Sequence, residues 1–253
     1  MSGVTAIETV AGATEIGVEI NKKARRFPCL VSTESVPELT RLAATPGGGW
    51  RIGASVPLTV IEERVAPGCP PLARMLRWFA ARQVRNRATL GGNLATASPI
   101  GDSAPVLLAL DAEVVLASAA GDRTVPLAEF FTGYRRTVLR PGEVIREVLL
   151  PPWTPTPGCE RRADFVKVSH RRELDISIVA AAFVVDVDAG GIVRRARLAY
   201  GGVADRPVRA RAAEAALIGK PLGEADEAVA AALAGQFTPI SDVRSGADYR
   251  REL

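Results

Sequence analysis

A proline-rich stretch near the middle of the chain limits the folds that it can adopt. Residues 151–157 hold four prolines, and a glycine follows at position 158. Proline lacks a backbone N–H and has a fixed φ angle, so such a stretch makes a poor helix or central strand. The 253 residues are enough for one large domain or two modest ones. We therefore predict an extended connector between a domain over residues 1–150 and a smaller domain over residues 160–253.

Before the connector, the hydrophobic pattern indicates short strands mixed with helices. The expected strands cover residues 7–11, 29–32, 50–54, 113–117, 123–126 and 143–150, with a hairpin across 113–126. One expected helix starts near residue 15, and others cover residues 58–65, 72–82 and 104–110.

After the connector, we expect strands over residues 163–168, 176–187 and 192–200. The last two are joined by Asp188-Ala189-Gly190-Gly191, which favours a tight hairpin turn. Two alanine-rich helices are expected over residues 207–218 and 224–234. An antiparallel sheet with helices on one face is typical of an α+β fold, which is the class that we predict.

The composition argues against several classes of protein. Hydrophobic residues make up 47% and charged residues 24%, as in an ordinary soluble globular protein. We find no run of about 18 apolar residues and no signal-like start, so we expect neither a membrane span nor secretion. The net charge is +4, but the arginines are scattered and aromatic residues make up only 5%, so we expect no nucleic-acid partner.

The cysteines and the histidine argue against a metal centre. Cys29, Cys69 and Cys159 are far apart, and His170 is the single histidine. Such spacing suits neither a disulfide framework, nor a zinc site, nor an iron–sulfur cluster. Any redox chemistry would therefore depend on an organic cofactor, and we expect a cytoplasmic location.

Two segments of small residues are candidates for binding phosphate. In the first segment (residues 11–17), a strand ends, Gly12 and Ala13 turn the chain, and a helix begins. The free N–H groups at a helix start suit a phosphate, although Thr14 could equally be a simple helix cap. Neither GxGxxG nor GxxxxGK[ST] occurs in the chain, which disfavours a Rossmann domain or a P-loop NTPase.

The second segment (residues 89–102) combines adjacent glycines with small polar side chains. We interpret it as a loop in which Gly91 and Gly92 permit positive φ angles and close backbone approach. Asn93, Thr96 and Ser98 offer donors for phosphate or ribose oxygens, and Asp102 offers an acceptor. From the residues alone, the alternatives stay open: Asp102 could cap the next helix, and Ser98-Pro99 could form an ordinary turn.

Four motifs in order resemble the FAD-binding domain of xanthine dehydrogenase and its molybdenum-hydroxylase relatives. They are residues 11–17, 77–102, 165–176 and 200–206, and together they extend over nearly the whole chain. The resemblance implies a two-subdomain, PCMH-type flavoprotein fold followed by a smaller antiparallel α+β domain. It also implies FAD as the cofactor.

The resemblance assigns residues to the cofactor. By this likeness, the FAD contacts are Gly12, Ala13, Thr14, Glu15, Ile16, Phe79, Thr89, Gly92, Asn93, Thr96, Ser98, Asp102 and Lys167. Phe79 would offer a flat face to a cofactor ring, and the Lys167 cation would raise the flavin potential. A core position for Phe79 and a solvated strand-end position for Lys167 are the alternatives. Arg77, Trp78 and Arg172 are similar to an Arg–aromatic cluster of the family.

The resemblance also implies the function. The chain would take electrons from a partner's iron–sulfur cluster and pass them to NAD⁺ or O₂, without turning over a purine substrate alone. Its partners would be iron–sulfur and molybdopterin subunits or domains. A flavoprotein of a CO-, nicotine- or aldehyde-type hydroxylase, or a truncated non-catalytic assembly module, is the alternative.

The sequence also departs from the family pattern. Few residues precede Gly12, and we expect the C-terminus to stop within a helix that relatives continue, so we expect weakened FAD binding or a need for partners. Leu174 lies where relatives often carry a polar or acidic residue.

Overall fold

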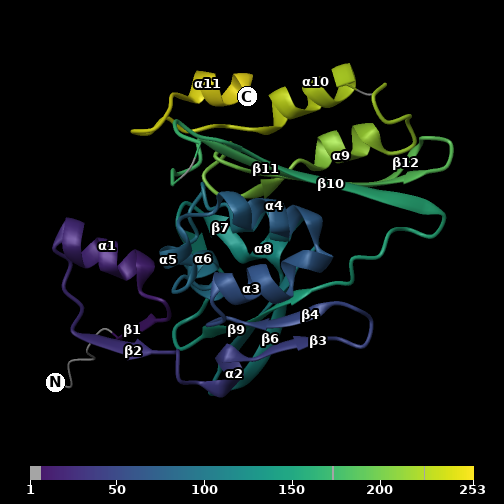
Figure 1. Ribbon diagram of the computed structural model, residues 1–253. Helices are drawn as coiled ribbons and strands as arrows, with labels where there is room; N and C mark the ends of the chain where they lie inside the picture. Colours follow the sequence, from purple (N-terminus) through teal and green to yellow (C-terminus); the bar gives the residue numbers. More distant parts are fainter. Residues whose placement is uncertain (1–6, 173, 225) are drawn as a thin grey trace.

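The computed structural model describes residues 7–172, 174–224 and 226–253. In its first unit, β1 (Ile7–Val10) pairs in parallel with β2 (Cys29–Ser32), and helix α1 (Thr14–Lys23) connects the two strands. α1 has no buried residue, so this unit contributes little to the core. In Figure 1 it is the purple unit at the side of the molecule, next to α5 and α6.

The next unit is a five-stranded antiparallel sheet in the order β3-β4-β9-β5-β6. Its strands are β3 (Leu42–Ala44), β4 (Trp50–Gly53), β5 (Glu113–Ser118), β6 (Gly121–Pro126) and β9 (Val144–Leu150). A small hairpin pairs β7 (Phe131–Gly133) with β8 (Arg136–Thr137). The helices of this unit are α2 (Pro37–Thr40), α3 (Leu58–Arg64), the 3₁₀ helix η1 (Ala66–Gly68), α4 (Pro70–Trp78), α5 (Arg82–Arg85), α6 (Leu90–Ala95), α7 (Ser103–Ala109) and α8 (Leu127–Phe130).

The C-terminal unit is a four-stranded antiparallel sheet in sequence order. Its strands are β10 (Cys159–Val168), β11 (Val179–Asp188), β12 (Val193–Gly201) and β13 (Val208–Arg209). Helices α9 (Arg211–Leu217), α10 (Asp226–Gln236) and α11 (Ala247–Glu252) follow. The chain is thus a mixed α/β unit followed by a smaller antiparallel-sheet unit, as the sequence predicts.

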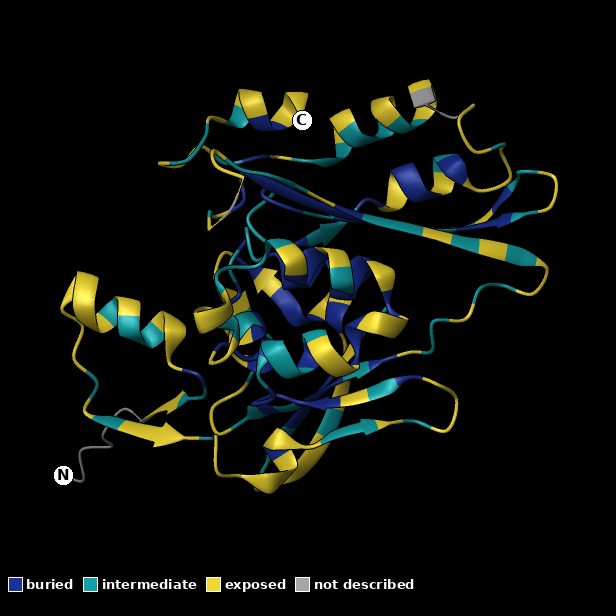
Figure 2. Cartoon of the chain, in the orientation of Figure 1, coloured by how far each residue is buried: buried dark blue, intermediate teal, exposed yellow. Residues whose placement is uncertain are grey.

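The main core lies between the two large sheets. α4 packs on β10, and α7 packs on β11 and β12. Leu72 and Leu107 from these helices share one buried cluster with Phe165, Ala180 and Val184 from the C-terminal sheet. Figure 2 shows this buried layer between the sheets. The two units therefore share a hydrophobic core, although the chain connecting them, residues 151–156, forms neither helix nor strand.

Most expected elements are confirmed within a few residues of their ends, but two expectations are wrong. The expected helix over residues 72–82 ends at Trp78, because Phe79 is extended and Ala80 has a φ of 46°. The second segment is not all loop, because α6 lies within it. Thr89 caps α6 by accepting a hydrogen bond from Gly92 N at 3.1 Å, which stabilises a helix whose first turn contains two adjacent glycines.

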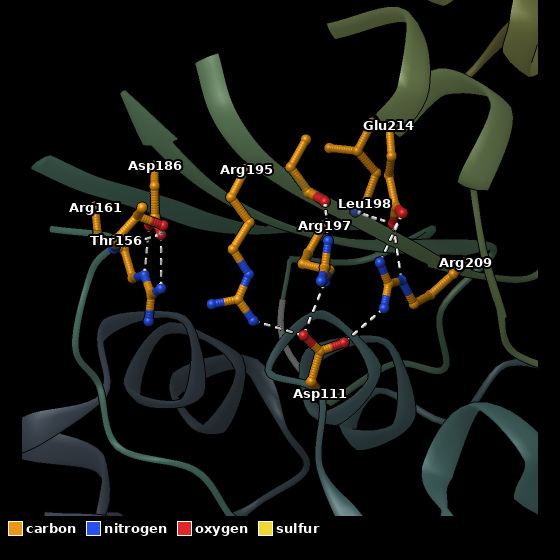
Figure 3. Close-up of polar contacts among 10 residues, drawn as sticks. Asp111, Thr156, Arg161, Asp186, Arg195, Arg197, Leu198, Arg209 and Glu214 are labelled. Carbon is orange, nitrogen blue, oxygen red and sulfur yellow. Dashed lines mark hydrogen bonds and ion pairs between the residues drawn. The ribbon is translucent and has the colours of Figure 1, made fainter. Parts of the chain in front are cut away.

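Charged side chains also join the two units (Figure 3). Asp111, just after α7, accepts hydrogen bonds from Arg195 at 2.6 Å, Arg197 at 2.8 Å and Arg209 at 2.6 Å. Partial burial acts to raise the pKa of Asp111, but the hydrogen bonds from Arg197 and Arg195 outweigh it and lower the pKa. The charged form of Asp111 therefore holds the end of α7 against β12 and β13.

Asp186 on β11 fixes the end of the connector. Its fully buried carboxylate accepts hydrogen bonds from Arg161 Nε at 2.6 Å, from Thr156 N at 2.9 Å and from Thr156 Oγ1 at 2.7 Å. Burial acts to raise the pKa of Asp186, but the hydrogen bonds from Arg161 and Thr156 lower it to about 2. A depressed carboxyl pKa stabilises the fold above its ordinary value of 3.8, and this contribution is lost as the pH falls through about 2.

We predict that Asp186→Asn lowers the free energy of unfolding at pH 7 by about 3–5 kcal/mol, because the Arg161 guanidinium is left buried without its counter-ion. It should also remove about 2 kcal/mol of pH dependence between pH 4 and pH 2, the equivalent of the pKa shift. Urea unfolding across pH measures both quantities. The control is Asp164→Asn on β10. Asp164 forms an exposed ion pair with Arg74, and its loss should lower the free energy of unfolding by about 0–1 kcal/mol. Equal losses for the two variants would contradict this account.

Candidate cofactor site

The first segment presents unpaired backbone donors. β1 ends at Val10, and Ala13, with a φ of 59°, is the N-cap residue that precedes α1. Ala13 provides no side-chain cap, and Thr14 is the first residue of the helix rather than its cap. Among the described residues, no acceptor is found for the amides of residues 14–16, whereas Gly17 N donates to Ala13 O at 2.7 Å. These three N–H groups are therefore available to an anion. The dipole of this ten-residue helix also favours an anion at its N-terminus.

Gly12 joins the first segment to the second. A Cβ atom at Gly12 would lie 1.6 Å from the carbonyl oxygen of Arg87 and 3.0 Å from Ala88 N. Any side chain at this position would therefore collide with backbone just before Thr89, where the second segment begins. The two segments, which are far apart in the sequence, are consequently neighbours in the fold. Glu15 is the second residue of α1, and its Oε1 atom lies 3.6 Å from Arg135 Nη1 in the β7–β8 hairpin.

Within the second segment, several predicted donors already have structural partners. Thr89 is buried and caps α6, and Thr96 Oγ1 donates to Gly92 O at 3.0 Å. Asn93 Oδ1 accepts a hydrogen bond from Ser103, which orients the amide and leaves its NH₂ group without a protein acceptor among the described residues. Gly92 is exposed, and a Cβ atom there would meet Thr89 Oγ1 alone, at 3.0 Å. The exposed face of α6 thus offers Gly92 and the Asn93 NH₂ group to a ligand.

The glycines of the second segment do not have the positive φ angles that the sequence suggested. The expected close approach is found at Gly91, where a Cβ atom would lie 2.4 Å from that of Ala54. Gly91 therefore serves the packing of α6 against the chain after β4.

Asp102 and Lys167 form one buried ion pair. Lys167 Nζ donates to Asp102 Oδ2 at 2.7 Å and to Trp78 O at 3.3 Å, and both charged side chains are less than 10% exposed. Ser177 donates to the other oxygen of Asp102, and no motif in the sequence indicates this contact. Lys167 is therefore not a solvated strand-end residue, and Asp102 does not cap α7 with its side chain. The pair is neutral overall, so the cation does not stand alone.

The aromatic residues near this pair are partly as expected. The Arg172 guanidinium lies 5.7 Å from the Trp78 ring centre, as the predicted cluster requires, whereas Arg77 is exposed. Phe79 is partly buried and packs against the main core. Ser98 is half-buried, and its hydroxyl accepts a weak hydrogen bond from Ile100 N at 3.4 Å.

Taken together, the site fits a large anionic ligand with a diphosphate group. It has free N–H groups at the start of α1, and α6 offers an exposed glycine and an amide donor. A buried ion pair that is neutral overall lies at Asp102, the last residue of the second segment. In the part of the chain that the structure describes, no cluster of three metal-ligating side chains is found. No helix among the described residues has the length and apolar character needed to cross a membrane.

Comparisons with known proteins show the family to which the chain belongs. Residues 3–153 match the family described as the FAD binding domain in molybdopterin dehydrogenase. Residues 164–253 match the C-terminal domain of the CO dehydrogenase flavoprotein. Carbon monoxide dehydrogenase from Hydrogenophaga pseudoflava is similar in structure, with a TM-score of 0.89 and 30% identity over 97% of this chain and 84% of that chain. Quinoline 2-oxidoreductase from Pseudomonas putida 86 gives a TM-score of 0.85 and 29% identity, with 98% and 85% covered.

Curated relatives are much longer than this chain. Xanthine dehydrogenase 2 of Arabidopsis thaliana is 37% identical over 229 residues, which is 83% of this chain and 16% of that protein. Xanthine dehydrogenase/oxidase of Rattus norvegicus is 35% identical over 262 residues, which is 96% of this chain and 19% of that protein. The chain therefore belongs to the family of FAD-binding domains of molybdopterin dehydrogenases.

Proposed function

We propose that this chain is the FAD-bearing, electron-transferring part of a xanthine dehydrogenase-like molybdenum hydroxylase. The observation that carries the proposal is the packing of Gly12 on Arg87, because it brings the two small-residue segments together in a member of an FAD-binding family. The residues that we assign to the FAD site, through direct contact or by positioning a neighbour, are Gly12, Ala13, Thr14, Glu15, Ile16, Phe79, Thr89, Gly92, Asn93, Thr96, Ser98, Asp102 and Lys167.

These residues have different roles in the proposal. The amides of residues 14–16 and the dipole of α1 hold the diphosphate, and the Asn93 NH₂ group donates to it from α6. Thr89 acts through its cap, which places Gly92 and Asn93 at the exposed start of α6. Asp102 and Lys167 set the local charge around the cofactor ring.

The bound FAD would supply the redox chemistry, taking electrons from a partner's iron–sulfur cluster and passing them to NAD⁺ or O₂. No side chain of this chain has to act as an acid, base or nucleophile in that role. The chain binds and orients the cofactor, and it needs iron–sulfur and molybdopterin subunits or domains as partners. The substrate belongs to the molybdenum part of such a complex.

Two alternatives are testable. The structural similarity to carbon monoxide dehydrogenase favours a CO-, nicotine- or aldehyde-type hydroxylase, whereas the sequence similarity to xanthine dehydrogenases favours a purine enzyme. The exposed face of α1 suits a chain that has become a non-catalytic assembly module. A yellow purified protein with about one FAD per chain supports the proposed function. A colourless protein that FAD does not reconstitute supports the assembly module.

We predict that Gly92→Val weakens FAD binding by roughly 10- to 100-fold, because the added side chain overpacks the exposed start of α6 where the ligand approaches. Fluorescence titration of the apoprotein with FAD measures the affinity. The matched control is Gly68→Val, since a Cβ atom at Gly68 meets nothing within 4 Å. Equal FAD affinities for the two variants, with both folded, would refute the assignment of α6 to the cofactor.

We predict that Lys167→Met lowers the flavin potential by roughly 30 mV or more, about 1.4 kcal/mol for two electrons. The reason is that Asp102 is left as an uncompensated negative charge, which disfavours adding electrons nearby. The double variant Asp102→Asn/Lys167→Met keeps the site neutral, so its potential should return toward that of the wild type. A redox titration in which all three proteins agree would remove this pair from the cofactor site.

We predict negligible hydroxylation of xanthine by the isolated chain, whereas an artificial electron donor should still support slow reduction of NAD⁺. The reason is that the described residues hold no cluster suited to a metal centre, and the substrate site belongs to a partner. Assays of urate formation and of NADH absorbance separate the two reactions. Xanthine turnover by the chain alone would contradict the subunit role.

A further inference from the structure

The C-terminal helix α11 carries an arginine that is completely buried. The Arg250 side chain is 0% exposed, although it lies three residues from the end of the chain. Its Nε atom is the one buried side-chain nitrogen or oxygen without a hydrogen-bond partner among the described residues. Burying a guanidinium with an unpaired N–H is unfavourable, so the contacts that it does make must be specific.

Arg250 holds a turn at the end of β12. Its Nη1 atom donates to Gly202 O at 3.1 Å, and its Nη2 atom donates to Asp242 Oδ1 at 2.9 Å. Gly202 has a φ of 89°, and a Cβ atom there would lie 2.2 Å from Ile178 O. This turn is therefore tightly placed between α11 and the start of β11.

The other side of the same turn contacts the second segment. Gly202 N donates to Pro99 O at 2.8 Å, and a Cβ atom at Gly201 would lie 3.1 Å from that oxygen. Three residues further on is Asp102, which pairs with Lys167 and with Ser177, the neighbour of Ile178. The corner at residues 98–102 is thus held between the Gly201-Gly202 turn and the buried ion pair.

We propose that Arg250 is a positioning residue that fixes this corner through Gly202, so that the C-terminal helix controls the cofactor loop. The effect of Arg250 on FAD binding rests on the proposed function, whereas its effect on the backbone of residues 98–102 does not. A planar guanidinium that donates to a carbonyl and a carboxylate in two directions fixes orientation in a way that an apolar side chain would not. If packing α11 were the only role of this side chain, a methionine at position 250 would serve, since apolar replacements of buried charges are often tolerated.

The test compares Arg250→Met, Arg250→Lys and the control Arg251→Met in the full chain. Arg251 lies on the same helix, but it is exposed and pairs with Asp248 at the surface. Amide hydrogen exchange of the apoprotein, well below the melting temperature of each variant, reports on residues 100–102 and on Gly202. FAD titration and the visible circular dichroism of the bound flavin report on the cofactor.

We expect Arg250→Met to speed exchange at these amides by about tenfold or more, since local opening governs protection. FAD affinity should fall by a similar factor, with an altered flavin signal. Arg250→Lys should recover part of both effects, and it carries the test if Arg250→Met does not fold. Arg251→Met should match the wild type.

Unchanged exchange at residues 100–102 in Arg250→Met would overturn the positioning role. Faster exchange with unchanged FAD affinity would overturn the link to the cofactor. A wild-type chain that binds no FAD would overturn the proposed function, whereas the exchange data would still decide whether Arg250 holds the corner.

Discussion

The contact between Gly12 and the Arg87 carbonyl is the constraint on which the rest of the site depends. It allows the turn between β1 and α1 to lie directly against the backbone that leads into α6. Without it, the free amides of α1 and the exposed start of α6 would belong to separate surfaces. The contact is formed by backbone on both sides, so it places the two segments without using a side chain. The side chains and amides nearby therefore stay available for a ligand.

Charged groups join the C-terminal sheet to the end of α7 and to the second segment. Asp111 meets three arginines from β12 and β13, and Asp102 meets Lys167 from β10. A buried pair such as Asp102 and Lys167 costs desolvation, so it contributes to orientation more than to stability. The ion pair at Lys167 also changes the electrostatic interpretation. A lone cation would favour added electrons, whereas a neutral pair changes the flavin potential only when one of its two charges is removed.

Much of the fold could be predicted from periodicity, and the cofactor from resemblance. The strand over residues 29–32 follows from its short apolar run, and the hairpin after Asp188 follows from its turn chemistry. The end of α4 at Trp78 could not be predicted, because Ala80 adopts a positive φ that no local signal requires. α6 was missed because adjacent glycines usually oppose a helix, and the cap by Thr89 is a matter of geometry. The contacts of Asp102 with its partners and of Gly202 with Pro99 join residues that are far apart in the sequence. They could therefore be identified only from the structure.

The most direct test of the account is amide hydrogen exchange of the chain with and without FAD. Convergence of the two segments on one diphosphate predicts that FAD slows exchange at residues 14–16 and at residues 92–102 together, with the same dependence on FAD concentration. Protection of one segment alone, or of neither, in a protein that holds FAD would contradict it.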